Sequence, residues 1–181
     1  RRAAKMVCLD LDHPEIENFI RWKVKEEEKV ASLVVGSRIL NRKLSKLIQL
    51  AKNKNVFPDS EVQPALCEAA DNGIPINYLV RALDLAKQGY DLSLQEFDTH
   101  YESEAYLTVS GQNSNNSVRI PNTFFEILGK KGMWELKGRI TGEVIKKIPA
   151  EKIWNDINYC AWSSADPGVQ YDTTINDWHT C

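Results

Sequence analysis

Two carboxylates and an imidazole stand close together near the start of the chain, at Asp10, Asp12 and His13. Side chains of these types bind divalent metals, and the carboxyl end of a strand is where α/β folds place ligands. The same residues also cap helices, and Pro14 suits the first turn of a helix. No second group of ligand-type residues accompanies them, so the sequence favours capping by Asp12 or His13 and predicts no metal site.

The cysteines offer a second kind of chemistry. Cys8, Cys67, Cys160 and Cys181 are widely spaced and form no CxxC motif, so they indicate neither a disulfide framework nor a zinc ribbon. His179 with Cys181 could be half a zinc site, or a nucleophile with its base. Neither of the other two histidines stands beside a cysteine, so no matching half exists. This cysteine usage predicts a reducing, cytoplasmic setting.

Short amides and hydroxyls are dense between residues 112 and 117, where Asn113, Asn115, Asn116 and Ser117 lie. Such side chains satisfy backbone groups in irregular turns, which predicts a loop. They could equally present hydrogen-bond donors to a phosphate or a ribose. The charged run at 23–29 is predicted to be a solvated helix face with i,i+4 pairs.

The elements that must position these residues alternate between strands and helices. The apolar run at 3–11 predicts a strand buried on both faces. A helix follows, in which Ile16, Phe19, Ile20 and Val24 recur at helical spacing. Later segments predict strands at 104–110, 118–120 and 169–175, a hairpin at 134–136 with 143–145, and helices at 122–128 and after Pro149.

Most of the stretch between these segments has helical periodicity. Apolar faces recur over 39–51, 62–70 and 76–86, with Gly73 and Gly89 after the second and third. No self-similar period marks a repeat array. The sequence therefore predicts an α/β sheet or barrel with a helical insertion near residues 37–95.

Composition limits the class of protein. The 181 residues are 43% apolar and 27% charged, which is globular usage, and the net charge of −2 gives no field that would hold nucleic acid. No apolar run approaches the roughly 18–20 residues of a membrane span. The chain opens without Met or a secretory signal and stops at Cys181 without a polar tail, which predicts an internal fragment.

Several stretches have exact sequences that indicate more than their periodicity and polarity alone. Residues 1–23 read RRAAKMVCLDLDHPEIENFIRWK, 111–126 read GQNSNNSVRIPNTFFE, and 165–181 read ADPGVQYDTTINDWHTC. Together with WELKGRITGEVIKKIPAEKIW at 134–154, in the same order, they resemble the adenosylcobalamin-dependent (class II) ribonucleotide reductases. The resemblance covers about residues 1–36 and 111–181.

This resemblance implies part of a ten-stranded α/β barrel that reduces the 2′-carbon of a ribonucleotide, usually a diphosphate. In the family, adenosylcobalamin starts the reaction through a thiyl radical, and a cysteine pair recharged by thioredoxin-like donors supplies the electrons. The radical cysteine of the family lies in an Asn-Pro-Cys-Ser-Glu motif that this chain lacks, and it is expected shortly beyond Cys181. No catalytic residue is therefore predicted here, and the chain alone is expected to be inactive.

The same resemblance assigns roles to segments and residues. Residues 1–36 would be a barrel strand–helix unit that begins at the end of the specificity loop, 37–103 the helical insertion, and 104–181 barrel elements leading toward the active-site segment. Arg1 and Arg2 would link an allosteric nucleoside triphosphate to substrate choice, with a solvated arginine pair as the alternative. The other candidates would shape the substrate or cobalamin face or merely satisfy backbone groups: Asn113, Asn115, Asn116, Ser117, Asp172, Thr173, Asn176, Asp177 and His179.

Two alternatives stay open. The first is the large subunit of an iron-dependent class I reductase, which would need a partner subunit to generate its radical. The second is a non-catalytic helical interaction module, which predicts that residues 37–95 fold alone. A homodimer is a further expectation, since dimers are common in the family.

Overall fold

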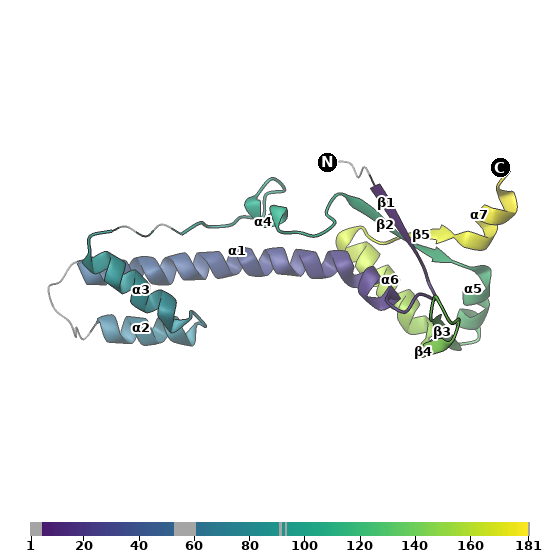
Figure 1. The fold of residues 1–181 in the computed structure, drawn as a ribbon, viewed down its shortest axis with the longest axis horizontal. Coiled ribbons are helices and arrows are strands. Elements are labelled where there is room, and N and C mark those ends of the chain that lie inside the picture. Colours follow the sequence, from purple (N-terminus) through teal and green to yellow (C-terminus); the bar gives the residue numbers. More distant parts are fainter. Residues whose placement is uncertain (1–4, 53–60, 91, 93, 181) are drawn as a thin grey trace. The chain divides into compact units, whose positions relative to one another are not determined.

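A computed structural model describes residues 5–52, 61–90, 92 and 94–180. The chain divides into two compact units (Figure 1). The α/β unit comprises Arg1–Lys29 and Val109–Cys181, and the helical unit comprises Val30–Thr108. Helix α1 (Ile16–Lys52) contributes residues to both.

A parallel sheet of three strands organises the α/β unit. The strands β1 (Lys5–Asp10), β2 (Ser114–Ile120) and β5 (Gly168–Tyr171) lie in the order β1-β2-β5, so β2 is central (Figure 1). Ser117 of β2 lies opposite Cys8 on one side and Gly168 on the other. The predicted α/β class is confirmed.

Helices cover one face of this sheet. The first turns of α1, together with α5 (Asn122–Gly129) and α6 (Ala150–Ser164), share a core with Val118 and Ile120 of β2. The hairpin of β3 (Met133–Lys137) and β4 (Val144–Pro149) closes this core, where Phe124 and Trp134 meet edge-to-face at 5.2 Å. Since side chains alternate along a strand, Arg119 points to the opposite face of the sheet.

The burial predicted for the first strand is wrong. Met6 is 57% exposed and Val7 43% exposed. The reason is that β1 is at the edge of the described sheet, with β2 on one side and helices on one face only. Its apolar residues alone could not reveal how many neighbours the strand has.

Two other predicted elements are wrong. Residues 104–110 do not form a strand, because α4 (Glu104–Leu107) begins there with Ser103 at its N-cap and Ala105 N–H donating to Ser103 Oγ at 3.3 Å. The polar segment 112–117 is not all loop, because residues 114–117 belong to β2. Residues 114–117 pair with β1, and β5 joins at Ser117, so these strands supply the ladder hydrogen bonds that those side chains would otherwise replace.

The strand predicted at 169–175 is only partly correct. It ends at Tyr171, and α7 (Asp172–Trp178) follows at once. Asn176 Nδ2 donates to the backbone oxygen of Asp172 at 2.9 Å, which stabilises the first helical turn. The hairpin and the helices after Pro121 and Pro149 are confirmed.

The helical unit is built from three packed segments. The second half of α1 packs with α2 (Val62–Asp71) and α3 (Ile76–Lys87) around Leu44, Leu47 and Leu79. Glycines with positive φ, Gly73 (φ 82°) and Gly89 (φ 87°), follow α2 and α3, as the sequence predicts. The face predicted for α3 is partly wrong, because Ile76 and Val80 at its edge are exposed.

The described strands form this three-stranded sheet and the hairpin, and they do not close into a barrel. The division of the chain into segments 1–36, 37–103 and 104–181 concerns their roles in a longer barrel, and it stays a prediction. Within the described residues, none of the helices combines the length and apolar character needed to cross a bilayer.

Candidate functional site

Charged side chains gather where the three parallel strands end. We call Asp10, Asp12, Arg119, Arg139 and Asp172 the carboxyl-edge cluster. Asp10 ends β1, Arg119 lies near the end of β2, and Asp172 directly follows β5. This edge is where parallel sheets place ligands, and the topology alone brings the three side chains to it.

Arg119 is the centre of the cluster. Its Nε donates to Asp172 Oδ1 at 2.9 Å, and its Nη2 donates to the same oxygen. Its Nη1 lies 3.7 Å from Asp10 Oδ1. The hydrogen bonds to Asp172 raise the pKa of Arg119 above its ordinary value, so the guanidinium stays charged at any pH the fold tolerates.

The second guanidinium joins the hairpin to the end of β1. Arg139 Nη2 donates to Asp12 Oδ1 at 2.5 Å and lies 3.9 Å from Asp10 Oδ2. The backbone N–H of Lys137 donates to the Asp12 carbonyl at 2.8 Å, and Trp134 Nε1 donates to the Leu11 carbonyl at 3.1 Å. The hairpin is therefore tied to the β1–α1 turn by side-chain and backbone contacts.

The cluster forms a row of alternating charge, from Asp12 through Arg139, Asp10 and Arg119 to Asp172. Three carboxylates against two guanidinium groups leave one negative charge. Both guanidinium forks could bind a phosphate bidentately, but here carboxylates accept from these donors. The cluster therefore links the end of β1, the end of β2, the β3–β4 hairpin and α7 at the edge where a ligand would lie.

The metal alternative at Asp10, Asp12 and His13 has no support in the described part of the chain. His13 Nδ1 accepts from the backbone N–H of Glu15 at 3.0 Å, so this histidine caps α1 as the sequence favours. The two carboxylates face guanidinium groups instead of each other. No three ligand-type side chains gather among the described residues.

The candidate residues of the sequence fall into two groups at opposite ends of the sheet. Asn113 is exposed in the turn before β2, Asn115 is exposed on β2, and Asn116 and Ser117 are buried there. The second group, in or just after α7, lies at the carboxyl edge: Asp172, Thr173, Asn176, Asp177 and His179. A strand rises about 3.3 Å per residue, so the structure does not bring the two groups together. Arg1, Arg2 and Cys181 lie outside the described residues.

The described cysteines are separate and free. Cys8 is exposed in the middle of β1, Cys67 is exposed on α2, and Cys160 is buried on α6. Burial raises the pKa of the Cys160 thiol, which makes it a poor nucleophile.

The amino end of β2 is fixed by helix α1. Lys23 Nζ donates to the carbonyls of Gly111 at 2.6 Å and Gln112 at 3.1 Å. Trp22 Nε1 donates to the Ser110 carbonyl at 3.2 Å, and Glu26 accepts from the Ser110 N–H at 2.9 Å. The charged run at 23–29 is therefore more than a solvated face, since it holds the turn that begins the central strand.

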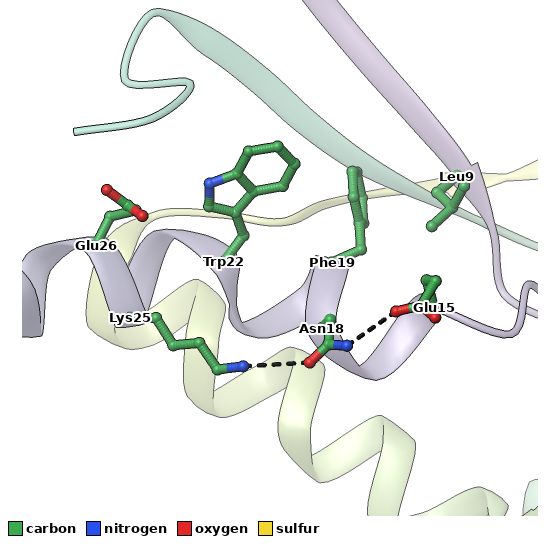
Figure 2. Close-up of a pocket in the computed structure, with 7 residues that line it drawn as sticks. All are labelled: Leu9, Glu15, Asn18, Phe19, Trp22, Lys25 and Glu26. Atoms are coloured by element: carbon green, nitrogen blue, oxygen red, sulfur yellow. Dashed lines mark hydrogen bonds between the residues drawn. The ribbon is translucent and has the colours of Figure 1, made fainter. Parts of the chain in front are cut away.

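A pocket of about 320 Å³ lies between β1 and the first turns of α1 (Figure 2). Leu9, Phe19 and Trp22 are its apolar residues. Its polar residues are engaged: Asn18 donates to Glu15 at 2.9 Å, Lys25 donates to Asn18 at 3.2 Å, and Glu26 accepts from the Ser110 N–H. A ligand here would meet few unengaged polar groups, so the carboxyl edge is the better candidate.

Comparison with known proteins agrees with this architecture. The family described as "Ribonucleotide reductase, barrel domain" matches residues 1–181. The chain belongs to this family. A parallel sheet with charged side chains at its carboxyl edge is consistent with such a reductase barrel.

Two of the similar proteins match the chain over nearly its whole length. It is 48% identical over 191 aligned residues to a protein of Bradyrhizobium diazoefficiens named "Vitamin B12-dependent ribonucleotide reductase", covering 100% of this chain and 15% of the relative. A protein of the same name from Agrobacterium fabrum is 46% identical over 99% of the chain and 15% of its own length. A "Vitamin B12-dependent ribonucleoside-diphosphate reductase" of Thermoplasma acidophilum is 36% identical over 35% of the chain and 8% of its length. The chain therefore spans about 15% of the first two relatives.

Arg119 and Arg139 are the site residues that sequence reasoning missed in this reductase segment. Arg119 stands alone among apolar residues near the end of a strand, just before Pro121. An isolated charge at the end of a buried strand is a usable signal, since such a charge needs a partner. Arg139 lies in a hairpin turn, where a charged residue carries no such signal.

Proposed function

We propose that this chain is part of the barrel of an adenosylcobalamin-dependent ribonucleotide reductase that converts ribonucleotides to deoxyribonucleotides for DNA synthesis. The observation that carries the proposal is the 48% identity, over the whole chain, to a reductase named for vitamin B12. Ribonucleoside diphosphates are the proposed substrates, in line with the name of the Thermoplasma acidophilum relative. The names of these relatives favour this class over the iron-dependent alternative.

The described residues do not by themselves fit the cofactor. A corrin with its nucleotide tail exceeds the drug-sized ligands that pockets of about 300–1,000 Å³ hold. The pocket beside Trp22 has about 320 Å³, and its polar side chains already have hydrogen-bond partners. We therefore propose that other parts of the longer protein bind the cofactor, which starts the radical chemistry when bound.

The role proposed for this chain is scaffold. The exposed Cys8 and the partly exposed Arg119 lie on its parallel strands, and the carboxyl edge of these strands is fixed by the charged cluster. Cys8, Cys67 and Cys160 are placed singly, which supports a reducing pair and a radical cysteine encoded elsewhere. The chain alone is accordingly expected to be inactive.

Further proposals follow from the family. Arg1 and Arg2 would end the loop through which a nucleoside triphosphate effector sets substrate choice. A thioredoxin-like protein would supply electrons, and the whole protein would act in the cytoplasm as a homodimer. The widely spaced cysteines support the reducing compartment.

Turnover by the full-length protein tests the proposal. Ribonucleoside di- and triphosphates would be incubated with dithiothreitol, with and without adenosylcobalamin, and deoxynucleotides measured by chromatography. Formation of deoxynucleoside diphosphates only with the cofactor is expected. Turnover that needs a separate iron subunit, and not adenosylcobalamin, would overturn the assignment to this class.

Two further arms sharpen the test. The chain 1–181 given the same cofactor and reductant is expected to form no product, and turnover by it would overturn the scaffold role. The variant Arg2→Ala in the full-length protein is expected to change which substrate each effector favours. Unchanged selectivity at normal turnover would remove the loop assignment.

A further inference from the structure

Helix α7 is a short element without a core of its own. It has seven residues, Asp172–Trp178, and none of them is buried. Isolated helices shorter than about 12–15 residues are marginal in water. Contacts with the rest of the α/β unit must therefore hold α7 in place.

Two polar contacts dock the first turn of α7. The Asp172 carboxylate accepts from Arg119 Nε at 2.9 Å and also from Nη2. Thr173 Oγ1 accepts from the backbone N–H of Asn122 at 3.0 Å, which joins the starts of α7 and α5. Thus two residues that the sequence assigns to the active centre act in the structure as anchors.

Arg119 is well placed to act as the fixed half of this contact. It extends from β2, the central strand, which pairs with β1 and β5 on its two sides. Asp10 at the end of β1 lies 3.7 Å from its other terminal nitrogen. A planar fork can meet carboxylates on two sides, whereas the single ammonium of lysine cannot reproduce this geometry.

We propose that Arg119 is a positioning residue that holds α7, and with it Asn176, Asp177 and His179, at the carboxyl edge of the sheet. Its effect on the reaction rests on the proposed function, but its effect on α7 does not. Without the Arg119 guanidinium, the Asp172 carboxylate loses its donors and the first turn of α7 becomes more mobile. The side chains that follow then lose their fixed place relative to the ends of the strands.

Amide hydrogen exchange on the chain 1–181 tests the structural half. In Arg119→Lys, the amides of residues 176–178, which have backbone acceptors inside α7, are expected to exchange at least about tenfold faster, while those of β2 stay protected. The control is Arg21→Lys, because Arg21 pairs with Asp156 at 2.7 Å in the same unit, away from α7. Exchange in α7 that is unchanged, or accelerated equally by Arg21→Lys, would overturn the proposal.

A second variant guards against general loss of structure. Asp172→Asn keeps the shape of the side chain but removes its charge, and it should accelerate exchange in α7 as Arg119→Lys does. Combining Arg119→Lys with Asp172→Asn should accelerate exchange in α7 little more than either change alone, because each of the three variants disrupts the same contact. Full additivity of the two changes would show that Arg119 acts on α7 by another route and would overturn the proposal.

Kinetics of the full-length reductase test the functional half. Arg119→Lys is expected to lower kcat about tenfold or more with little change in KM, because misplacement affects reactive geometry more than ground-state binding. Accelerated exchange with unchanged kcat would overturn the role in the reaction. A wild-type protein without cobalamin-dependent turnover would instead overturn the proposed function and leave the exchange result standing.

Discussion

The two units of the chain are built from different kinds of contact. In the α/β unit, β1 pairs with a strand more than a hundred residues later, and large side chains such as Phe124 and Trp134 fill the core. In the helical unit, α2 and α3 are neighbours in sequence, and alanines such as Ala65, Ala69 and Ala82 fill much of the core. The α/β unit therefore depends on long-range pairing and the helical unit on close local packing.

This difference explains where function-related polar groups lie. The carboxyl-edge cluster needs several chain segments to meet, and β1, β2, the hairpin and α7 of the α/β unit provide such a meeting. The tryptophans follow the same division, because all five of the chain lie in residues 1–29 and 109–181. Tryptophan fluorescence thus reports on the α/β unit, and far-ultraviolet circular dichroism reports on both.

The largest expected effect is that of Phe124→Ala. Phe124 is fully buried and contacts the rings of Phe125, Trp134 and Trp154. Removing a buried phenyl ring from a packed core costs about 3–5 kcal/mol of unfolding free energy. Urea unfolding followed by tryptophan fluorescence should show a lower midpoint and an unfolding free energy reduced by this amount.

The matched change in the helical unit is Leu79→Ala. Leu79 is also fully buried, and its loss should cost about 2–5 kcal/mol. If the units unfold independently, circular dichroism should detect this loss while the fluorescence midpoint stays in place. An equal shift of the circular dichroism and fluorescence midpoints would show that the two units unfold as one cooperative unit, and would contradict their independence.

A smaller effect is expected for Trp134→Phe. The indole N–H donates to the carbonyl of Leu11, the buried residue that follows β1. Phenylalanine keeps most of the apolar area but leaves that oxygen without this donor, at a cost of about 1–3 kcal/mol. Thermal unfolding checks the value, and a loss no larger than that of an exposed control such as Trp162→Phe would contradict it.

The equivalent polar contact in the helical unit is that of Ser37. Its hydroxyl donates to the Val34 carbonyl at 2.9 Å and accepts from the Phe97 N–H at 3.0 Å. Ser37→Ala is expected to cost about 1 kcal/mol and to speed exchange of the Phe97 amide. Unchanged exchange at Phe97 would show that this contact does not hold the segment.

The smallest effect concerns one glutamate in each unit that binds two lysines. Hydrogen bonds from Lys146 and Lys152 lower the pKa of Glu17, and those from Lys43 and Lys46 lower the pKa of Glu68 to about 2. A lowered pKa in the folded state stabilises the fold above the ordinary value of 4.5, and this is lost as pH falls toward 2.

Unfolding at neutral pH and at acid pH tests this reading. Glu17→Gln should reduce the acid sensitivity of the α/β unit by less than about 1 kcal/mol, because the pairs are partly exposed. Glu68→Gln should act in the same direction on the circular dichroism signal alone. Acid sensitivity that is unchanged in both variants would show that solvent screens these pairs fully.

The sequence predicts elements well where the decisive contacts are local. Helix α6 follows Pro149 and buries Ile153, Ile157 and Cys160 at the spacing that its apolar residues indicate. The hairpin at Gly138 also follows from neighbouring residues. In these segments the residues that determine the structure lie within about twenty positions of each other, because the connections are short.

Prediction fails where distant segments decide the structure. Asn115, Asn116 and Ser117 have turn-forming side chains, yet pairing with β1, joined by β5 at Ser117, places them in a strand. The carboxyl-edge cluster could be predicted only in part, at Asp10 and Asp12, because the partners of these carboxylates come from β2 and the hairpin. Family resemblance predicted roles for Asp172, Thr173, Asn176, Asp177 and His179, and the structure adds the pairing of Arg119 with Asp172.

The position of β2 between two shorter partners has a practical consequence. Among the described strands, β1 and β5 each pair on one side only, so the outer backbone groups of both are available to another strand. Such edges are templates for intermolecular pairing. Purified on its own, the chain should therefore self-associate as its concentration rises, and dilute solutions are the condition in which its folding is best measured.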